Sequence, residues 1–163
     1  IGQKLREHPW TFGTATFTES IHNDKVKAYS EKLLKELNYT GVCEVEFLYH
    51  PAEKAYMLIE INPRTWLWVG LAKANGINHA LYAYNYLNGI ESDYPKSYEA
   101  GLKWRNFWTD SVYSMMAMAK GKISPGAYLK SINGNVVSAV RSKDDPKPFR
   151  AMTRMLFALA ARR

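Results

Sequence analysis

Cysteine is nearly absent from this chain, since Cys43 is the only one in 163 residues. A single thiol cannot form a disulfide within the chain, which excludes a small secreted domain held together by disulfides. We therefore expect a reducing, cytoplasmic compartment.

Long apolar runs are also lacking. No stretch of 18 uninterrupted apolar residues occurs, so the sequence excludes a membrane-spanning helix. The pattern of a signal peptide, a charged start followed by an apolar stretch and a small-residue cleavage site, is absent as well. Because the first residue is Ile1 rather than methionine, we expect a fragment of a longer protein.

Histidines do not occur at metal-binding spacing. The four of them are scattered along the chain, and no two lie four residues apart, as the ligands of a zinc-binding helix do. The sequence thus gives no indication of zinc. They are His8, His22, His50 and His79.

What the chain does contain is enough apolar sequence for a core, with 47% hydrophobic and 23% charged residues.

Charge is unevenly distributed along the chain. Residues 1–100 hold 10 Lys+Arg and 12 Asp+Glu, for a net charge of −2. Residues 101–163 hold 12 Lys+Arg and 3 Asp+Glu, for a net charge of +9. Such a bias attracts an anionic partner, or it is a solvated basic face.

The order of apolar periods and turn residues predicts an α+β fold, an antiparallel sheet with flanking helices. Strands are expected at 10–17, with Gly13 as a bulge or close-approach point, and at 42–49, 56–62 and 136–140. Helices are expected to open at Asn23-Asp24, to follow Arg64 as far as Asn75-Gly76, and to run through Leu81, Tyr84 and Leu87. Further helices are expected to span 110–120, to open at Ser124-Pro125 and to end the chain. The run Met115-Met116-Ala117-Met118 is predicted as helix core.

Two acidic strands carry the chemistry. Side chains alternate faces along a strand, so Glu44 and Glu46 share a face, as do Glu60 and Asn62. In an antiparallel hairpin centred near Glu53, Glu46 would lie opposite Glu60, and Glu44 opposite Asn62. This register places like charges about 5 Å apart, which destabilises a sheet.

A hard divalent cation would offset this repulsion. Mg²⁺ takes one or two carboxylates and completes its shell with waters and substrate phosphates. Asn62 adds a neutral oxygen, and Arg64 supplies a planar fork for phosphate oxygens. The alternative is the solvent-facing polar side of an ordinary sheet, with Arg64 paired to a glutamate.

The string Glu60-Ile61-Asn62-Pro63-Arg64, with Glu44-Val45-Glu46-Phe47 on the preceding strand, resembles the magnesium-binding hairpin of ATP-grasp enzymes. The resemblance is to carbamoyl-phosphate-synthase-like proteins and D-aspartate-ligase-like enzymes, and it runs from about residue 39 to 89.

The resemblance implies specific roles. Glu46, Glu60 and Asn62 would be ligands of Mg²⁺, or of Mn²⁺ in its place, and Glu60 would bridge two ions. Arg64 would contact the transferred phosphate or acylphosphate as the catalytic residue. Glu44 has no ligand role in this comparison.

The same resemblance implies an ATP-dependent ligase that joins a small carboxylate to an amine or ammonia through an acylphosphate. Residues 1–100 would be the C-terminal part of an ATP-grasp domain, and residues 101–163 a basic helical extension packed on it. The upstream half of the same protein would have to complete the ATP site, so we expect the chain alone to be inactive.

Further substrate candidates lie outside the hairpin. The loose continuation of the resemblance suggests Arg6, Gly13 and Thr14, and its order of elements suggests Trp66, with Trp68 beside it. Plain strand and core packing are the alternatives. Arg105 lies in Lys103-Trp104-Arg105-Asn106-Phe107-Trp108, which interleaves cations with aromatics. It is a candidate for an anionic substrate, or the segment belongs to a noncatalytic module that binds nucleic acid or another anionic ligand. We do not expect nucleic acid or a membrane as the partner. A degenerate ATP-grasp scaffold without turnover is a third reading.

Overall fold

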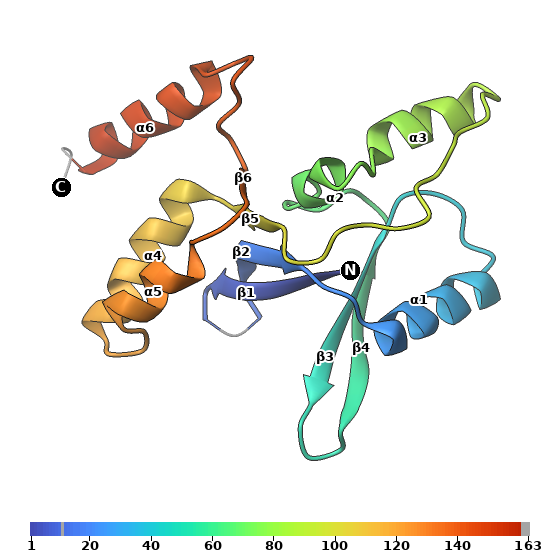
Figure 1. The fold of residues 1–163 in the computed structure, drawn as a ribbon, viewed down its shortest axis with the longest axis horizontal. Coiled ribbons are helices and arrows are strands. Elements are labelled where there is room, and N and C mark those ends of the chain that lie inside the picture. The colour runs from blue at the N-terminus through green and yellow to red at the C-terminus, as the bar shows by residue number, and fades with distance from the viewer. Residues whose placement is uncertain (11, 161–163) are drawn as a thin grey trace. The chain divides into compact units, whose positions relative to one another are not determined.

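The computed structural model describes residues 1–10 and 12–160. Six strands and six helices occur in that part of the chain (Figure 1). In order they are β1 (Gly2–His8), β2 (Thr14–Ser20), α1 (Asp24–Glu36), β3 (Glu44–His50), β4 (Ala55–Asn62), α2 (Gly70–Ala74), α3 (His79–Leu87), β5 (Lys103–Arg105), α4 (Phe107–Ala119), α5 (Pro125–Ser131), β6 (Val136–Ser138) and α6 (Lys147–Ala160).

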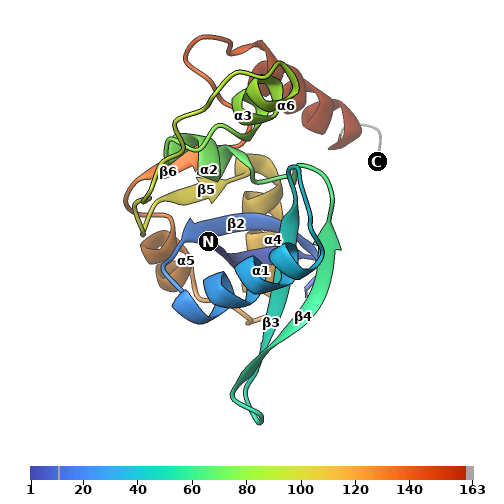
Figure 2. The same cartoon turned by 90° about the vertical axis from the view of Figure 1, so that its right-hand side faces the viewer.

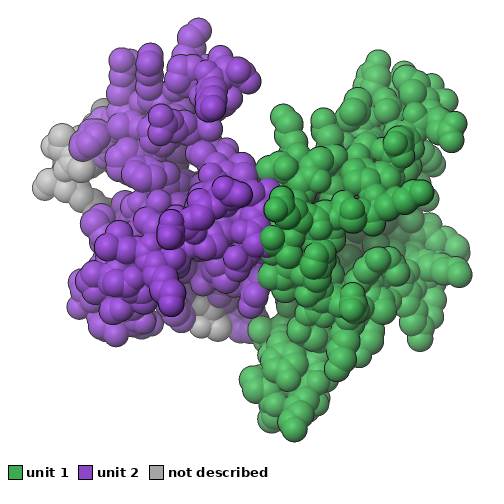
Figure 3. Space-filling model, viewed as in Figure 1, with its two compact units in different colours: residues 1, 20–100 green, residues 2–19, 101–163 purple. Residues whose placement is uncertain are grey.

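The chain divides into two compact units (Figure 3). Unit 1 comprises residue 1 and residues 20–100, and unit 2 comprises residues 2–19 and 101–163. The sequence placed residues 2–19 with the first part of the chain. They lie in unit 2 because β2 pairs antiparallel with β5, with Phe17 opposite Arg105.

Unit 2 is built on a four-stranded sheet in the order β1-β2-β5-β6. Phe17 on β2 and Trp104 on β5 are its largest buried apolar side chains, at 0% and 2% exposure. The β5–β6 pair is parallel, whereas the sequence suggested antiparallel pairing. Helix α4 contacts β1, where the His8 and Tyr113 rings stack with centroids 3.4 Å apart.

Unit 1 is built on the antiparallel hairpin β3–β4, with α1 alongside it (Figures 1 and 2). Tyr29 of α1 contacts Phe47 of β3, and Asn23 Nδ2 donates to the Tyr56 hydroxyl at 2.7 Å. Helix α1 therefore covers the hairpin face that holds Phe47 and Tyr56, and the acidic residues are on the other face. The α+β class with antiparallel pairing and flanking helices is confirmed.

Several predicted bounds are wrong at their edges. Thr11, within the predicted strand 10–17, lies outside the described residues, and the strand begins at Thr14. The helix predicted to follow Arg64 as far as Gly76 is shorter and forms only α2, after a tight turn in which the Arg64 N–H bonds to the Asn62 carbonyl at 2.8 Å. Strand β6 ends at Ser138, whose hydroxyl accepts from the Arg141 N–H at 2.9 Å and turns the chain.

Two predicted apolar faces are exposed. On α4 the buried positions are Asp110, Ser114 and Ala117, which recur at helical spacing, so Met115 and Met116 lie off that face and are 58% and 47% exposed. Of the run predicted as helix core, Ala117 is therefore buried, and the prediction is wrong for Met115 and Met116. On α3, the predicted helix forms, but its apolar side, Leu81, Tyr84 and Leu87, is exposed.

Candidate metal centre

The hairpin β3–β4 has the register that the acidic pattern predicted. Glu46 is paired with Glu60, and Glu44 with Asn62. A bulge follows: Phe47 pairs with Leu58, so β4 carries one extra residue, Ile59. The bulge lies between these four polar residues and the hairpin turn. The four residues therefore keep regular pairing and share one face of the hairpin.

Asn62 connects the acidic side chains. Its Nδ2 donates to Glu60 Oε1 at 2.7 Å and approaches Glu44 Oε2 at 3.4 Å. The amide thus compensates negative charge on both strands. If the Asn62 side-chain amide turned by 180°, its Oδ1 would face Glu60 in place of the N–H groups. In that orientation the amide would offer an oxygen ligand to a cation.

The four polar side chains differ in their exposure to solvent. Glu44 is 9% exposed, Glu46 and Asn62 are half-buried, and Glu60 is exposed. Next to Glu44, burial raises the pKa of the Cys43 thiol. Cys43 is therefore a neutral thiol near pH 7 and adds no charge to the acidic face.

Arg64 lies just beyond the end of β4 and is exposed. Its guanidinium donates to the Thr65 carbonyl at 3.1 Å and approaches Asn62 Oδ1 at 3.4 Å. The Arg64 guanidinium is thus anchored next to the acidic face, and some of its N–H groups are open to solvent.

The donor set fits a hard cation. Two opposed carboxylates and one amide are oxygen donors of the kind that Mg²⁺ and Mn²⁺ take, and the exposed Glu60 leaves the site open. Among the described residues, no group of three His, Cys, Asp or Glu side chains is arranged to hold a metal. A cation here would hence need water or phosphate oxygens to fill its shell.

Trp66 and Trp68 follow the hairpin and pack together. Their ring centroids lie 5.6 Å apart in an edge-on contact, and Trp66 also contacts His79 of α3 at 5.2 Å. Burial lowers the pKa of His79, so its imidazole is neutral near pH 7. Trp66 Nε1 is buried without a hydrogen-bond partner in the described chain. A substrate contact for Trp66 stays a prediction.

Arg6 and Arg105 lie in unit 2 and share one carboxylate. Asp110 is fully buried; its Oδ1 lies 2.6 Å from Arg6 Nε, and its Oδ2 lies 2.7 Å from Arg105 Nε. The side chains of the two arginines are 9% and 12% exposed. The Arg105 guanidinium also donates to the hydroxyls of Ser111 and Tyr128. These contacts explain the position of both arginines, and a substrate role for either stays a prediction.

Sequence reasoning missed Asp110. The signal was available, since Asp110 is one of only three acidic residues after residue 100 and lies on the same helical face as Ser114 and Ala117. An acid on the small-residue face of a helix points to a buried cationic partner.

Gly13 marks a close approach of the backbone. A Cβ atom at this position would lie 2.0 Å from the Pro9 carbonyl oxygen, so only glycine fits. The prediction of a close-approach point is confirmed. Thr14, the next residue, is exposed at the start of β2, and contact of Gly13 or Thr14 with substrate is untested.

The cation–aromatic run at residues 103–108 is largely structural. Trp104 is core, and Trp108 donates from Nε1 to Thr153 Oγ1 at 3.1 Å and contacts Phe149 of α6. Packing contacts therefore account for the positions of both tryptophans.

Comparison with known families identifies part of the chain. The family model described as "Carbamoyl-phosphate synthase L chain, ATP binding domain" matches residues 13–82. This segment, less than half of the chain, is thus similar to an ATP-grasp domain. It includes β2, α1, the whole hairpin and α2, and the resemblance drawn from the sequence is confirmed. No curated protein and no solved structure matches the chain.

Membrane insertion of a helix is not supported. Within the described residues, every helix is too short or too polar to cross a bilayer.

Proposed function

We propose that the ATP-grasp segment belongs to an ATP- and Mg²⁺-dependent ligase that joins a small carboxylate to an amine or ammonia. The family match supports an ATP-dependent ligase in general terms. The observation that carries the proposal is the register of β3–β4, which aligns Glu46 with Glu60 and brings Asn62 to the same face.

Glu46, Glu60 and Asn62 would hold the cation. When bound, Mg²⁺ or Mn²⁺ neutralises charge on the phosphate oxygens of ATP. Glu60, the most exposed of the three, is the ligand best placed to reach a second ion. Asn62 is held beside Glu60 and Glu44 by its hydrogen bonds to both carboxylates.

Arg64 would orient the phosphate during transfer. A carboxylate oxygen of the substrate attacks the γ-phosphorus, and ADP leaves with the electron pair of the broken P–O bond. The amine nitrogen then attacks the acyl carbon, and phosphate leaves. The open part of the Arg64 fork binds phosphate oxygens in both steps.

The upstream half of the protein is part of this proposal. Arg64 is exposed next to the polar face of the hairpin, and a triphosphate carries more charge than this arginine and the metal ions can orient. We infer that cationic side chains preceding Ile1 contact the α- and β-phosphates, and that the chain alone is inactive.

The test compares Glu60→Gln with the matched change Glu53→Gln in the exposed hairpin turn. In protein that includes the upstream half, Glu60→Gln should lower metal-dependent ADP release with a carboxylate and an amine by about 100-fold or more, as expected for loss of a metal ligand. Glu53→Gln should leave it unchanged.

Metal binding is tested separately on the chain itself. Mn²⁺ should broaden the NMR amide signals of β3 and β4, and Glu60→Gln should weaken this effect. Equal broadening in both variants would contradict the site. Mn²⁺ binding without ADP release would leave a scaffold that holds metal but does not turn over.

A further inference from the structure

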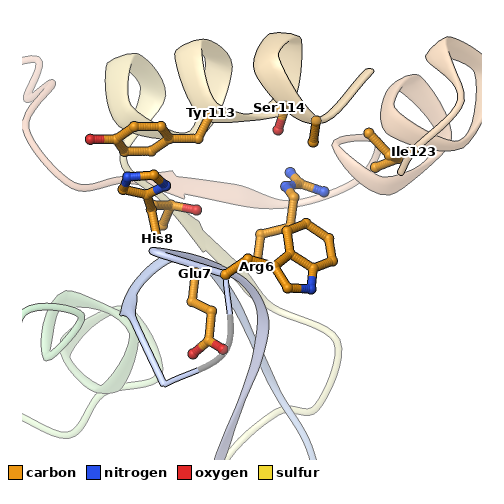
Figure 4. Close-up of a pocket in the computed structure, with 9 residues that line it drawn as sticks. Arg6, Glu7, His8, Tyr113, Ser114 and Ile123 are labelled. Atoms are coloured by element: carbon orange, nitrogen blue, oxygen red, sulfur yellow. The ribbon is translucent and has the colours of Figure 1, made fainter. Parts of the chain in front are cut away.

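Unit 2 contains a pocket that the proposed ligase site does not use. It lies between β1 and α4 and is a small cavity of about 40 Å³ that is partly open to solvent. A cavity of this size holds a few water molecules or one small ligand. Its lining includes Arg6, His8, Trp10, Ser114, Ala117 and Ile123 (Figure 4).

Arg6, which lines this pocket, belongs to a buried cluster with excess positive charge. Arg6 and Arg105 share the single carboxylate of Asp110, so the cluster has two cations for one anion in a nearly solvent-free environment. A buried charge without a counter-ion is costly. One further negative charge would balance the cluster.

Arg6 retains donors for such a ligand. Its guanidinium has five N–H groups, of which three are used, two toward Asp110 and one toward Ser131 Oγ at 2.6 Å. The Arg6 guanidinium faces α4 across the pocket (Figure 4).

Ser114 supplies an independent indication of a ligand. It is only 2% exposed, and its hydroxyl has no hydrogen-bond partner among the described residues. An unmade hydrogen bond of a buried hydroxyl costs stability. The hydroxyl points from α4 toward the Arg6 side of the pocket (Figure 4).

Much of the remaining lining is aromatic or apolar, beside the polar Thr16. Trp10 lies under the Lys122 ammonium, 5.1 Å from its ring centroid, and Ala117 and Ile123 add aliphatic surface. Glu7 also lines the pocket, but its carboxylate points away from α4 (Figure 4). The pocket thus combines hydrogen-bond donors at one end with carbon surface elsewhere.

We propose that unit 2 binds a small monocarboxylate in this pocket. The carboxylate accepts from the Arg6 guanidinium and the Ser114 hydroxyl, and the carbon chain contacts Trp10 and Ile123. A single negative charge matches the one excess positive charge of the Arg6–Asp110–Arg105 cluster, whereas a phosphate dianion would exceed it.

The test titrates the whole chain with acetate, isobutyrate and benzoate, and with acetamide and inorganic phosphate for comparison. The Trp10 indole and Ser114 amide NMR signals should shift in a saturable way with the carboxylates and not with acetamide. ATP and metal are left out, so failure here is distinguishable from failure of the ligase proposal.

Ser114→Ala should weaken carboxylate binding about tenfold, the loss expected for one hydrogen bond to a charged group. Because the hydroxyl has no partner within the described chain, this variant should keep or raise the melting temperature. Ser142→Ala, in the exposed loop before α6, is the matched control and should bind as the original chain does.

Ile123→Trp is a second variant that fills the pocket, and it should abolish binding. Absence of saturable shifts with all three carboxylates would overturn the proposal. So would equal binding of acetamide, tighter binding of phosphate, or unchanged binding in both Ser114→Ala and Ile123→Trp.

Discussion

At the scale of single residues, Asp110 is expected to have a large effect on stability. It is the only carboxylate within ion-pair distance of Arg6 and Arg105 in the described chain, and Thr16 Oγ1 approaches the same group at 3.4 Å. Its removal would leave two guanidinium groups buried without a counter-charge.

Asp110→Asn should therefore lower the free energy of unfolding by about 3–5 kcal/mol. Urea denaturation of the chain measures this, with Asp144→Asn, in an exposed loop, as the control. If the two variants unfolded at the same urea concentration, the cluster would not stabilise unit 2.

At this scale, sequence reasoning found the acidic face but not the buried cluster. Glu46 and Glu60 could be aligned because strand alternation and a short turn fix which residues oppose one another. Arg6 and Asp110 are 104 residues apart, and no local pattern relates them.

At the scale of secondary-structure elements, the start of α1 links helix formation to packing on the hairpin. Asn23 Oδ1 accepts from the Val26 N–H at 3.1 Å and caps the helix, while its Nδ2 donates to Tyr56 on β4. One side chain thus holds the helix end and the sheet together.

Asn23→Ala should cost about 1–2 kcal/mol, since both the cap and the contact with Tyr56 are lost. Asn23→Asp keeps the capping acceptor but not the donor, so it should cost less. A double-mutant cycle with Tyr56→Phe, measured by urea denaturation, isolates the contact. An interaction energy of zero would show that the two side chains do not couple.

Capping and turn residues made most helices and strands predictable from the sequence, but the bulge in β4 was not predictable. Asn23 and Ser124 are capping residues of known preference, and each accepts from a backbone N–H of its helix. The extra residue Ile59 has no sequence signal, because an isoleucine fits a regular strand as well as a bulge. The predicted pairs nonetheless hold, since the bulge lies on the turn side of Glu46.

At the scale of the whole molecule, two cores stabilise two units. Leu71, at 3% exposure, belongs to unit 1, and Trp104, at 2%, belongs to unit 2. Because the two side chains belong to different units, we expect truncation of each to act on its own unit.

Trp104→Ala should destabilise unit 2 by about 3–5 kcal/mol, and Leu71→Ala should destabilise unit 1 by about 2–5 kcal/mol. Amide hydrogen exchange distinguishes them: the first variant should speed exchange in β1, β2 and α4, and the second in α2. Equal acceleration throughout both units in either variant would indicate one cooperative structure instead.

The division into units was the least predictable feature. The sequence analysis grouped strand β2 with the rest of residues 1–100. Its partner β5 follows some 85 residues later, beyond the hairpin and α3. Pairing at this separation depends on tertiary packing, which a periodicity within one segment does not reveal.

This late pairing matters for how the protein is made. A ribosome adds about 5–20 residues each second, so β2 emerges several seconds before β5 does. Until then the hydrogen-bonding edge of β2 and the ring of Phe17 have no permanent cover. The nascent chain is thus exposed to aggregation during translation, and it is a natural client for chaperones that shield unfinished sheets.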